Sequence, residues 1–497
     1  MYKKKHIRSL LLASLMFITS GCSPKAATPE TTNQTNSNNE TNEIQKPKQI
    51  TAMLDIFSIS EEDGRQQILN KYKELTGIEL YINQPPHNQY YEKVNLSFAS
   101  GDLPDVIELA PSDNTSFLTY ATQGALTDIT NWVENSPALK NANQTIVNSM
   151  RVDGKLFGFP SDTGNGSVTM LRQDWLDNLG INVPTNYEEF LNVLRAFTFN
   201  DPDKNGKNDT KGFTAAGFDN ITDNYRYVLD FMQDAVPNFI QKDGVWVDGF
   251  QQPEMIAAIE RIRTAYKEGI IDQDIITNKT STAREKFQTD EIGCMSYWAG
   301  QWNVSLENKA KRVNSSAEII SIPPIAEVTY INRVPPAHCI TSACDNPEAA
   351  FKYFIEFMHD GGEGQTLFTY GVEGLTYDIV DGKGEWRGSI SDPSTPYSKV
   401  VLNPFLEIVP FKENIFEPPA LLSNSLNKFN TRTTQASLPL LTDTYIKMNA
   451  DIIEARSTAF SKMILGDMSI EDGMSAYTKK VNNELKMQTI LKEMNSK

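Results

Sequence analysis

The stretch DPDKNGKNDTKG, residues 201–212, carries oxygen-bearing side chains at alternate positions. Carboxylate, amide and backbone carbonyl oxygens are the ligands that calcium prefers, and a loop of the EF-hand type supplies them from alternate positions around a bend glycine. The residues at these positions are Asp201, Asp203, Asn205, Lys207 through its backbone carbonyl, and Asp209. Because Gly206 allows the sharp bend, the spacing predicts a calcium ion with a structural role.

The predicted calcium loop lacks one feature of a full EF-hand, because Gly212 stands where a bidentate Glu would be. Fewer charged ligands weaken calcium binding, so we expect an affinity in the micromolar to millimolar range. The alternative is an Asx-rich turn that needs no metal.

Aromatic side chains gather in CMSYWAGQWN, residues 294–303. Flat aromatic faces and planar polar side chains are the groups that bind a sugar ring and its hydroxyls. Trp298 and Trp302 are four residues apart and would share one face of a helix, with Tyr297 beside them. These three residues are candidate sugar-binding residues; the alternative is that they belong to the core.

A second candidate set lies in FPSDTGNG, residues 159–166, where a predicted strand enters a Gly-rich loop. Asp162 and Asn165 could meet ligand hydroxyls there, although turn formation explains the same residues nearly as well. Arg172, a few residues further on, is expected to form an ion pair within its own lobe of the fold rather than to contact a ligand.

A third candidate set lies in YGVEGLTYD, residues 370–378. Glu373 stands between Gly371 and Gly374, whose backbone freedom would let the loop direct the carboxylate outward. Tyr370 and Tyr377 are candidate stacking partners for a sugar in the same loop.

Motifs of catalysis are absent from the sequence. It contains no HExxH, GxSxG or P-loop motif, and only His87, His338 and His359 follow the N-terminal segment. A glycosidase needs two carboxylates, but 63 acidic residues make any chosen pair uninformative. We therefore predict that the protein is not an enzyme.

Cysteines beyond Cys22 are few and odd in number: Cys294, Cys339 and Cys344. This pattern favours buried thiols over a disulfide framework, with a bridge between Cys339 and Cys344 left open. Zinc bound by His338 and these two cysteines is a weaker alternative, because no paired ligand motif is present.

The elements that would position these residues alternate between strand and helix. Residues 49–58, 78–83 and 105–109 have the pattern of strands, and residues 61–77 and 90–101 that of helices. Alternation of this kind predicts an α/β fold whose ligands bind at the carboxyl ends of the strands. Asp153-Gly154 predicts a hairpin turn, and Pro253 and Pro347 predict helix starts.

A capping box at Thr185 and Glu188 predicts a further helix start. Behind it, a row of apolar residues at helical spacing is expected in the core: Tyr187, Phe190, Leu191, Leu194 and Phe197.

The N-terminus, MYKKKHIRSLLLASLMFITSGC, has the basic start and short apolar run of an export signal. It resembles a bacterial lipoprotein signal in which Cys22 of Thr19-Ser20-Gly21-Cys22 is lipidated, for example with palmitate; the alternative is a soluble secreted protein. Residues 23–49 lack aromatic side chains and predict a flexible tether, so the fold should begin near Ile50.

The net charge of the chain argues against one class of binding partner. The formal net charge is −17 over 497 residues, which argues against nucleic acid as a partner. The length predicts two or more lobes, and we expect a monomer attached to the membrane only through its lipid.

Four segments resemble family 1 extracellular solute-binding proteins, the carbohydrate-capturing components of ABC importers. They are FASGDLPDVIEL, residues 98–109; residues 167–212; YGVEGLTYDI, residues 370–379; and the closing FSKMILGDMSIEDGMSAYTKKVNNEL. The second segment, with its acidic turn, resembles a lipoprotein branch of oligosaccharide binders related to alginate-binding proteins.

This resemblance implies a two-lobed α/β fold of the periplasmic-binding-protein type (type II), with a hinge and a ligand cleft between the lobes. We expect a first lobe from residues 50–161 plus 325–385, and a second lobe from residues 162–324 plus 386–497.

The same resemblance implies a lipid-anchored receptor on the extracellular face of the cell membrane of a Gram-positive bacterium. It would deliver a carbohydrate, with an oligosaccharide favoured, to ABC permease subunits. The alternative function is a cell-surface carbohydrate-active enzyme or a scaffold lipoprotein with the same fold.

Overall fold

The structure is a computed structural model that describes residues 44–111, 116–395, 399–411, 414–436, 438 and 440–496. The predicted export signal, Cys22 and residues 23–43 of the predicted tether lie outside this range. The folded unit begins at Ile44. Its first strand starts at Gln49, one residue before the predicted start of the fold.

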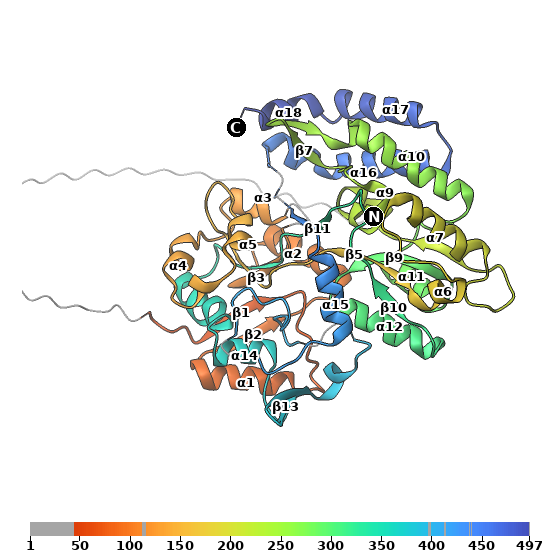
Figure 1. Cartoon of the computed structure of the whole chain (residues 1–497). Coiled ribbons are helices and arrows are strands. Elements are labelled where there is room, and N and C mark those ends of the chain that lie inside the picture. The colour runs from red at the N-terminus through yellow and green to blue at the C-terminus, as the bar shows by residue number, and fades with distance from the viewer. Residues whose placement is uncertain are drawn as a thin grey trace, which may run out of the picture. The chain divides into compact units, whose positions relative to one another are not determined.

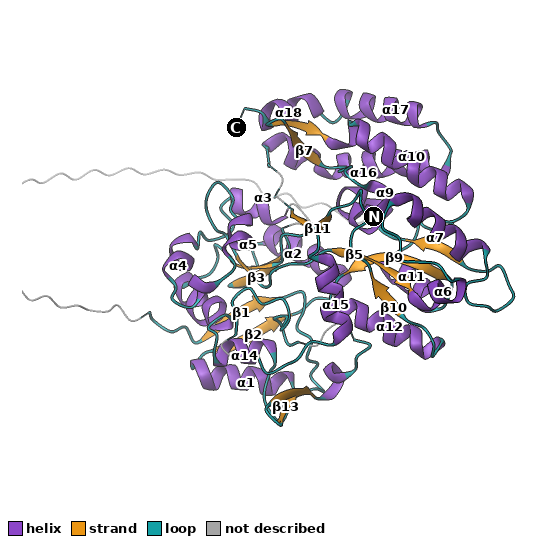
Figure 2. Ribbon diagram, in the orientation of Figure 1, coloured by secondary structure: helices purple, strands orange, loops and turns teal. Residues whose placement is uncertain are grey.

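The first lobe is built on a five-stranded sheet with the order β2-β1-β3-β12-β4 (Figures 1 and 2). Its strands are β1 (Gln49–Met53), β2 (Glu79–Asn83), β3 (Val106–Leu109), β4 (Phe159–Pro160) and β12 (Ala337–Ile340). β1 runs parallel to β2 and β3, whereas β12 is antiparallel to both of its neighbours. Since β12 comes from far along the chain, the first lobe is built from two separate segments of the sequence.

Helices connect the parallel strands of this sheet as the sequence predicts. α1 (Arg65–Thr76) and α2 (Tyr90–Ser100) end at Gly77 and Gly101, whose positive φ angles of 77° and 79° close each helix. The lobe also holds α3 (Ser116–Thr122), α4 (Thr130–Asn135), α5 (Gln144–Ser149), α13 (Pro347–Ala350) and α14 (Glu363–Thr369).

The second lobe is built on a four-stranded sheet with the order β10-β5-β9-β6. Its strands are β5 (Ser167–Arg172), β6 (Lys211–Thr214), β9 (Ile292–Trp298) and β10 (Ile319–Ser321). β5 and β9 are antiparallel, so Ser167 at the start of one strand faces Trp298 at the end of the other. The surrounding helices include α6 (Gln173–Leu179), α7 (Tyr187–Phe199), α10 (Pro253–Glu268), α11 (Thr280–Gln288) and α12 (Gln301–Val313).

Two sheets that share crossing segments confirm the predicted two-lobed α/β fold class. The chain crosses between them at residues 161–166 and 322–336, and backbone bonds tie the two crossings together. Ser161 N donates to Pro336 O at 2.8 Å, and Arg333 N donates to Asn165 O at 3.1 Å. A side chain at Gly166 would place its Cβ 2.0 Å from Ile331 O, so only glycine fits between these crossings.

A third segment joins the crossing near its middle. β11 (Tyr330–Asn332) pairs in parallel with β15 (Thr433–Gln435), which follows α15 (Ala420–Phe429). Through this pair the C-terminal part of the chain is bound to the crossing between the lobes.

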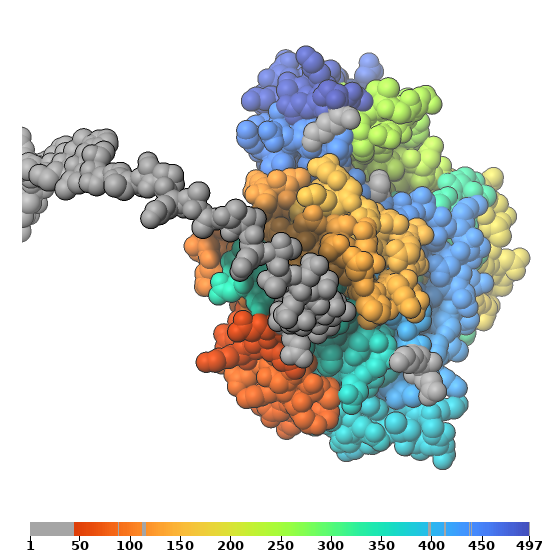
Figure 3. All heavy atoms as spheres, turned by 90° about the vertical axis from the view of Figure 1, so that its left-hand side faces the viewer, coloured from red at the N-terminus to blue at the C-terminus, as the bar shows by residue number. Residues whose placement is uncertain are grey.

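The C-terminal helices extend the second lobe. α16 (Asp443–Leu465), α17 (Ile470–Asn483) and α18 (Met487–Met494) pack with α10 and with the hairpin of β7 (Phe239–Lys242) and β8 (Val245–Asp248). Figure 3 shows the blue C-terminal segment beside the green segment that includes α10, at one end of the folded unit. Two short helices, α8 (Ile221–Asn224) and α9 (Leu229–Met232), lie beneath α16 and α10.

A buried ion pair connects α16 to the end of β8. Arg456 is fully buried, and its Nη2 donates to Asp248 Oδ1 at 2.8 Å. Tyr477 Oη of α17 donates to Asp248 Oδ2 at 2.9 Å. The aspartate therefore joins the hairpin to α16 and α17.

The segment after residue 385 contacts both lobes. Ser389 Oγ donates to Asp63 at 2.7 Å, Val401 N to Phe368 O at 2.8 Å, and Asn143 N to Ile408 O at 3.0 Å; the partners Asp63, Phe368 and Asn143 lie in the first lobe. Ser305 Oγ and Arg312 Nη2 of α12, in the second lobe, donate to Ser394 O and to Asp392. The predicted lobe boundaries, which place this segment in the second lobe, stay predictions.

Local predictions are confirmed in part. α10 and α13 begin at Pro253 and Pro347, and Asp153 and Gly154 form a turn with positive φ at both residues. The capping box is shifted by one residue: the Asn186 side chain accepts from Glu189 N, and Glu189 accepts from Thr185 N.

Candidate ligand-binding site

A cavity of about 600 Å³ lies where the second lobe, the crossing segment and the first lobe meet. Its wall is formed by residues 220–226, the β7–β8 hairpin, β11, the end of β15 and α16, with Pro111 after β3 on the first-lobe side. This volume is within the range of about 300–1,000 Å³ that is usual for small-molecule sites. The carboxyl end of β3 borders it, as the α/β pattern predicts.

The side chains of this cavity combine aromatic rings with amides and hydroxyls. Tyr225 and Trp246 are half-buried rings in its wall, and Asn238, Gln241 and Asn449 are amides in the same wall. Rings and amides together are the groups that bind sugars.

Two buried oxygen atoms of the cavity wall have no hydrogen-bond partner among the described residues: Thr222 Oγ1 and Asn220 Oδ1. Thr222 is only 3% exposed. Because buried polar atoms are nearly always paired, these two atoms are suited to bind polar groups of a ligand.

Two arginines of the cavity wall lie over one indole ring. The guanidinium carbons of Arg226 and Arg333 are 5.5 Å and 4.7 Å from the ring centroid of Trp298. Arg226 Nε also donates to the carbonyl of Asp223 at 2.7 Å. Cation–π contacts of this kind hold the arginine side chains against the ring, so Trp298 positions charges rather than presenting an open face to the cavity.

The predicted aromatic set is divided between two elements. Residues 292–298 form β9, and α12 begins at Gln301, so the segment is not one helix and Trp298 and Trp302 do not share a helix face. Tyr297 is buried, and Arg284 lies over both its ring and that of Trp302, at 5.1 Å and 4.6 Å. None of the three borders the cavity, although Trp298 contacts two residues that do.

The loop residues Asp162 and Asn165 are buried at the first crossing. Asp162 Oδ1 accepts from Gly164 N at 2.7 Å, and Asn165 Nδ2 donates to Ala299 O at 2.8 Å. Both side chains therefore shape the crossing, and neither borders the cavity. Arg172 forms ion pairs with Asp174 and Asp290 inside the second lobe, as predicted.

The third predicted set belongs to a small separate core. Tyr370 is 1% exposed and packs with Tyr377 and Phe416, and its hydroxyl donates to Asn414 Oδ1 at 2.8 Å. Glu373 is exposed at the neighbouring turn. None of the predicted set borders the cavity. β13 (Tyr377–Val380) pairs with β14 (Lys383–Trp386), and Phe416 packs against both tyrosine rings.

A group of charged side chains lies near the carboxyl ends of β1 and β3 in the first sheet. Glu108 Oε2 accepts from Asp55 N at 3.0 Å; burial, with the charge of Asp55 second, raises the pKa of Glu108 to about 7. Burial lowers the pKa of Lys399 despite the neighbouring carboxylates of Asp162 and Glu108. Arg333 is within electrostatic range of Lys399, so this group adjoins the arginine wall of the cavity.

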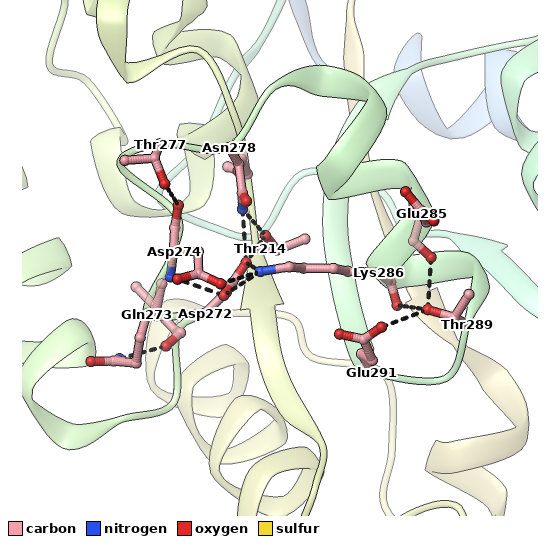
Figure 4. A network of polar contacts seen from close by, with 12 residues as sticks. Thr214, Asp272, Gln273, Asp274, Thr277, Asn278, Glu285, Lys286, Thr289 and Glu291 are labelled. Carbon is pink, nitrogen blue, oxygen red and sulfur yellow. Dashed lines mark hydrogen bonds and ion pairs between the residues drawn. The ribbon is translucent and has the colours of Figure 1, made fainter.

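A polar network fixes α11, the helix that carries Arg284 (Figure 4). Lys286 Nζ donates to both carboxylate oxygens of Asp272 and to Asp274, each at 2.9 Å. Thr214 Oγ1, at the end of β6, donates to Asp272 Oδ2 at 2.8 Å. Burial opposes the charge of Asp272, but the donors from Lys286 and Asn278 hold its pKa below the usual value.

The predicted calcium loop follows α7 and precedes β6. Asn205 Nδ2 donates to Asp203 Oδ2 at 2.7 Å and to Asp209 Oδ1 at 3.2 Å, and Gly206 N donates to Asp201 Oδ2 at 3.0 Å. Asp203 and Asp209 thus accept from the side-chain amide of Asn205, and Asp201 accepts from the backbone N–H groups of Asn205 and Gly206. Among the described residues, no three His, Cys, Asp or Glu side chains are grouped closely enough to hold a metal.

The thiols are free, as the sequence favours. Cys294 and Cys339 are buried, Cys344 is partly buried, and no disulfide joins these described residues. Burial raises the pKa of Cys294 and Cys339 well above the usual value, so neither thiol is activated as a nucleophile.

Comparison with known proteins gives the family. Residues 58–358, more than half of the chain, match the family model described as bacterial extracellular solute-binding protein. The chain belongs to this family. Among the described residues of this solute-binding protein, no helix has the length and hydropathy to cross a membrane.

Individual relatives support the same fold. The solute-binding protein is 25% identical to lipoprotein LipO of Bacillus subtilis over 390 residues, 76% of this chain and 74% of LipO. It resembles the crystal structure of the alginate-binding protein AlgQ2 without calcium ion (TM-score 0.64, 20% identity, 91% and 98% of the two chains). It also resembles an EF-hand mutant of S. pneumoniae FusA in complex with fructo-nystose (TM-score 0.64, 16% identity, 90% and 98%).

The cavity residues of this solute-binding protein were not found from the sequence alone. Arg226 and Thr222 lie in short helices without a recognisable motif, and Arg333 follows β11 on the crossing segment.

Proposed function

We propose that this protein captures an oligosaccharide in the cavity between its lobes and delivers it to the permease subunits of an ABC importer. The observation that carries the proposal is the cavity itself, in which half-buried rings, amides and two unpartnered buried oxygens meet at the crossing segment. The names of AlgQ2 and FusA, which refer to alginate and to a fructo-oligosaccharide complex, support the ligand class.

Capture follows from the two-lobed architecture. A ligand that contacts both lobes stabilises a closed arrangement only through contacts that the open arrangement lacks. The paired crossings at residues 161–166 and 330–336 are the segments about which such closure would occur.

We expect oligosaccharides to raise the melting temperature in a saturable manner and to remain intact. A ligand at about 100 times its Kd adds about 2.7 kcal/mol of stability. Thermal unfolding with a panel of oligosaccharides measures this, and chromatography of the same mixtures detects cleavage. Stabilisation with intact sugar supports a receptor, whereas products released by the protein would favour the alternative of a carbohydrate-active enzyme.

A matched pair of variants locates the site. Trp246→Ala should weaken binding about tenfold, because it removes a ring of the cavity wall. Trp132→Ala removes a half-buried ring outside the cavity and should leave the affinity unchanged. Equal affinities of the two variants would remove the cavity from consideration.

The proposal includes a lipid anchor at Cys22 and a position on the extracellular face of a Gram-positive membrane. The likeness to a lipoprotein supports it. Two acyl signals or one acyl chain with a second attraction are needed for stable anchoring. Cys22→Ala should move the protein from the membrane fraction to the medium; a variant that stays in the membrane would show another means of attachment.

We also propose calcium in the loop at residues 201–209. Asp201, Asp203, Asn205 and Asp209 would supply side-chain oxygens and Lys207 its carbonyl. Burial raises the pKa of Asp203, and the charges of Asp201 and Asp209 raise it further, so a cation would relieve the repulsion. The ion would fasten the end of α7 to the start of β6.

Calcium should therefore raise the melting temperature, and at 100 times its Kd it should add about 2.7 kcal/mol to the free energy of unfolding. Asp203→Asn should reduce this gain, and Asp274→Asn, in the polar network of α11, should leave it intact. An unfolding transition that does not respond to complete chelation and to added calcium would identify the loop as a metal-free turn.

A further inference from the structure

The charge of the cavity wall is opposite in sign to that of the protein. The chain has a formal net charge of −17, with 63 acidic and 46 basic residues. In contrast, the described residues of the wall include two arginines, Arg226 and Arg333, and one acidic residue, Asp223. A site with surplus positive charge on an acidic protein attracts and orients anionic groups.

The two arginines come from separate parts of the chain. Arg226 lies in the short 3-10 helix η4 (Tyr225–Val228) of the second lobe, and Arg333 follows β11 on the crossing. Both guanidinium groups lie over Trp298, at 5.5 Å and 4.7 Å from the ring centroid. A shared ring therefore brings two planar cations to one region of the wall.

The chemistry of these side chains favours a carboxylate. The guanidinium fork matches the two oxygens of a carboxylate and can donate two parallel hydrogen bonds. Packing on an aromatic ring fixes the plane of the fork and reduces the entropy lost on binding. Nearby, Thr222 Oγ1 can donate to or accept from a hydroxyl, and Asn220 Oδ1 can accept from one.

We propose that the cavity binds sugars that carry a carboxylate, as uronic acids do, and that Arg226 and Arg333 bind this group. The proposal rests on the proposed function and specifies its substrate class. Likeness to relatives does not decide the charge, because alginate is an anionic polymer and fructo-oligosaccharides are neutral. The two arginines of the cavity wall, Arg226 and Arg333, are the feature that favours a charged sugar.

Trisaccharides of galacturonate, glucuronate and mannuronate, each compared with its methyl ester, provide the test. The ester keeps the length and shape of the sugar and removes the charge. By titration calorimetry, at least one free acid should bind 10- to 100-fold more tightly than its ester, the range expected for charge-assisted hydrogen bonds. Its affinity should also fall with added salt.

Variants of the two arginines test their role. Arg226→Gln and Arg333→Gln should each weaken binding of the acid by 10- to 100-fold and leave the ester unchanged. Arg333→Lys keeps the charge without the guanidinium fork, so its affinity for the acid should lie between those of the unaltered protein and Arg333→Gln. Arg312→Gln, an exposed arginine on α12 outside the cavity, should bind as the unaltered protein does. Unfolding temperatures without ligand show whether each variant is folded.

The outcomes separate this inference from the proposed function. The inference is wrong if the esters, or a neutral trisaccharide such as maltotriose, bind as tightly as every acid. That result would leave the proposed function as an oligosaccharide receptor intact. An acid preference without salt dependence or response to the arginine variants would also overturn the inference. If no saccharide of either kind binds at millimolar concentration, the proposed function itself fails.

Discussion

Arg456→Met will destabilise the folded protein by about 3–5 kcal/mol, as expected for a buried ion pair that loses one partner. The substitution leaves the carboxylate of Asp248 buried beside Tyr477 without its cation. Methionine fills most of the volume, so the lost charge rather than a cavity is responsible. Equilibrium unfolding in urea, followed by circular dichroism, measures the loss.

A double variant separates the lost attraction from the stranded charge. Arg456→Met combined with Asp248→Leu removes both charges and should recover much of the stability, because paired apolar replacements of a buried ion pair are often tolerated. The control is Arg387→Met, whose exposed partner is Asp378 and which should cost less than about 1 kcal/mol. If Arg456→Met loses as little stability as Arg387→Met, water reaches the ion pair of Arg456 and Asp248.

The free energy of unfolding should also fall as the pH rises from about 4 to about 6, because the buried carboxyl group of Asp230 loses its proton in this range. Asp230 is fully buried, and although Thr169 and Ser296 donate to it, burial raises its pKa from 3.8 to about 6. In this range the unfolded chain has lost the proton that the folded chain keeps. The folded state is therefore favoured at low pH and loses about 3 kcal/mol of that advantage above pH 6.

Asp230→Asn should remove this part of the pH dependence, because an amide does not titrate. Unfolding free energies at pH 4, 5, 6 and 7 will show a smaller slope in the variant. Asp219→Asn, which alters an exposed carboxylate paired with Lys279, should retain the slope. An unchanged slope in Asp230→Asn would assign the titration to another group.

Local features of the fold could be predicted because they depend on neighbours in sequence. Helix ends at Gly77 and Gly101 and helix starts at Pro253 and Pro347 follow from backbone preferences. The capping box moved by one residue because Asn186 competes with Thr185 for the N-cap position.

The sequence could not decide between strand and helix for β9, because an apolar run carries no clear period. IGCMSYW is buried along almost all of its length, as a central strand is, and a short run of this kind cannot be told from a buried helix. The spacing of Trp298 and Trp302 then suggested a shared face that the fold does not provide.

The candidate site could not be predicted, because its contacts are distant in sequence. Arg226 and Arg333 meet over Trp298 only after two crossings between the lobes have formed. Tyr370 and Tyr377 illustrate the same limit: their loop suggested an open stacking surface, yet a later segment supplies Phe416 and closes a small core over them. A sequence pattern indicates which residues are available for binding, but not what covers them.

The position of Trp298 gives the protein an optical property. Its emission depends on the charges beside the indole, and two guanidinium groups lie over the ring. A ligand that draws either arginine away from the ring would change the electric field at that fluorophore. Occupancy of the cavity could then be followed from the intrinsic fluorescence of one of the six tryptophans, without a label.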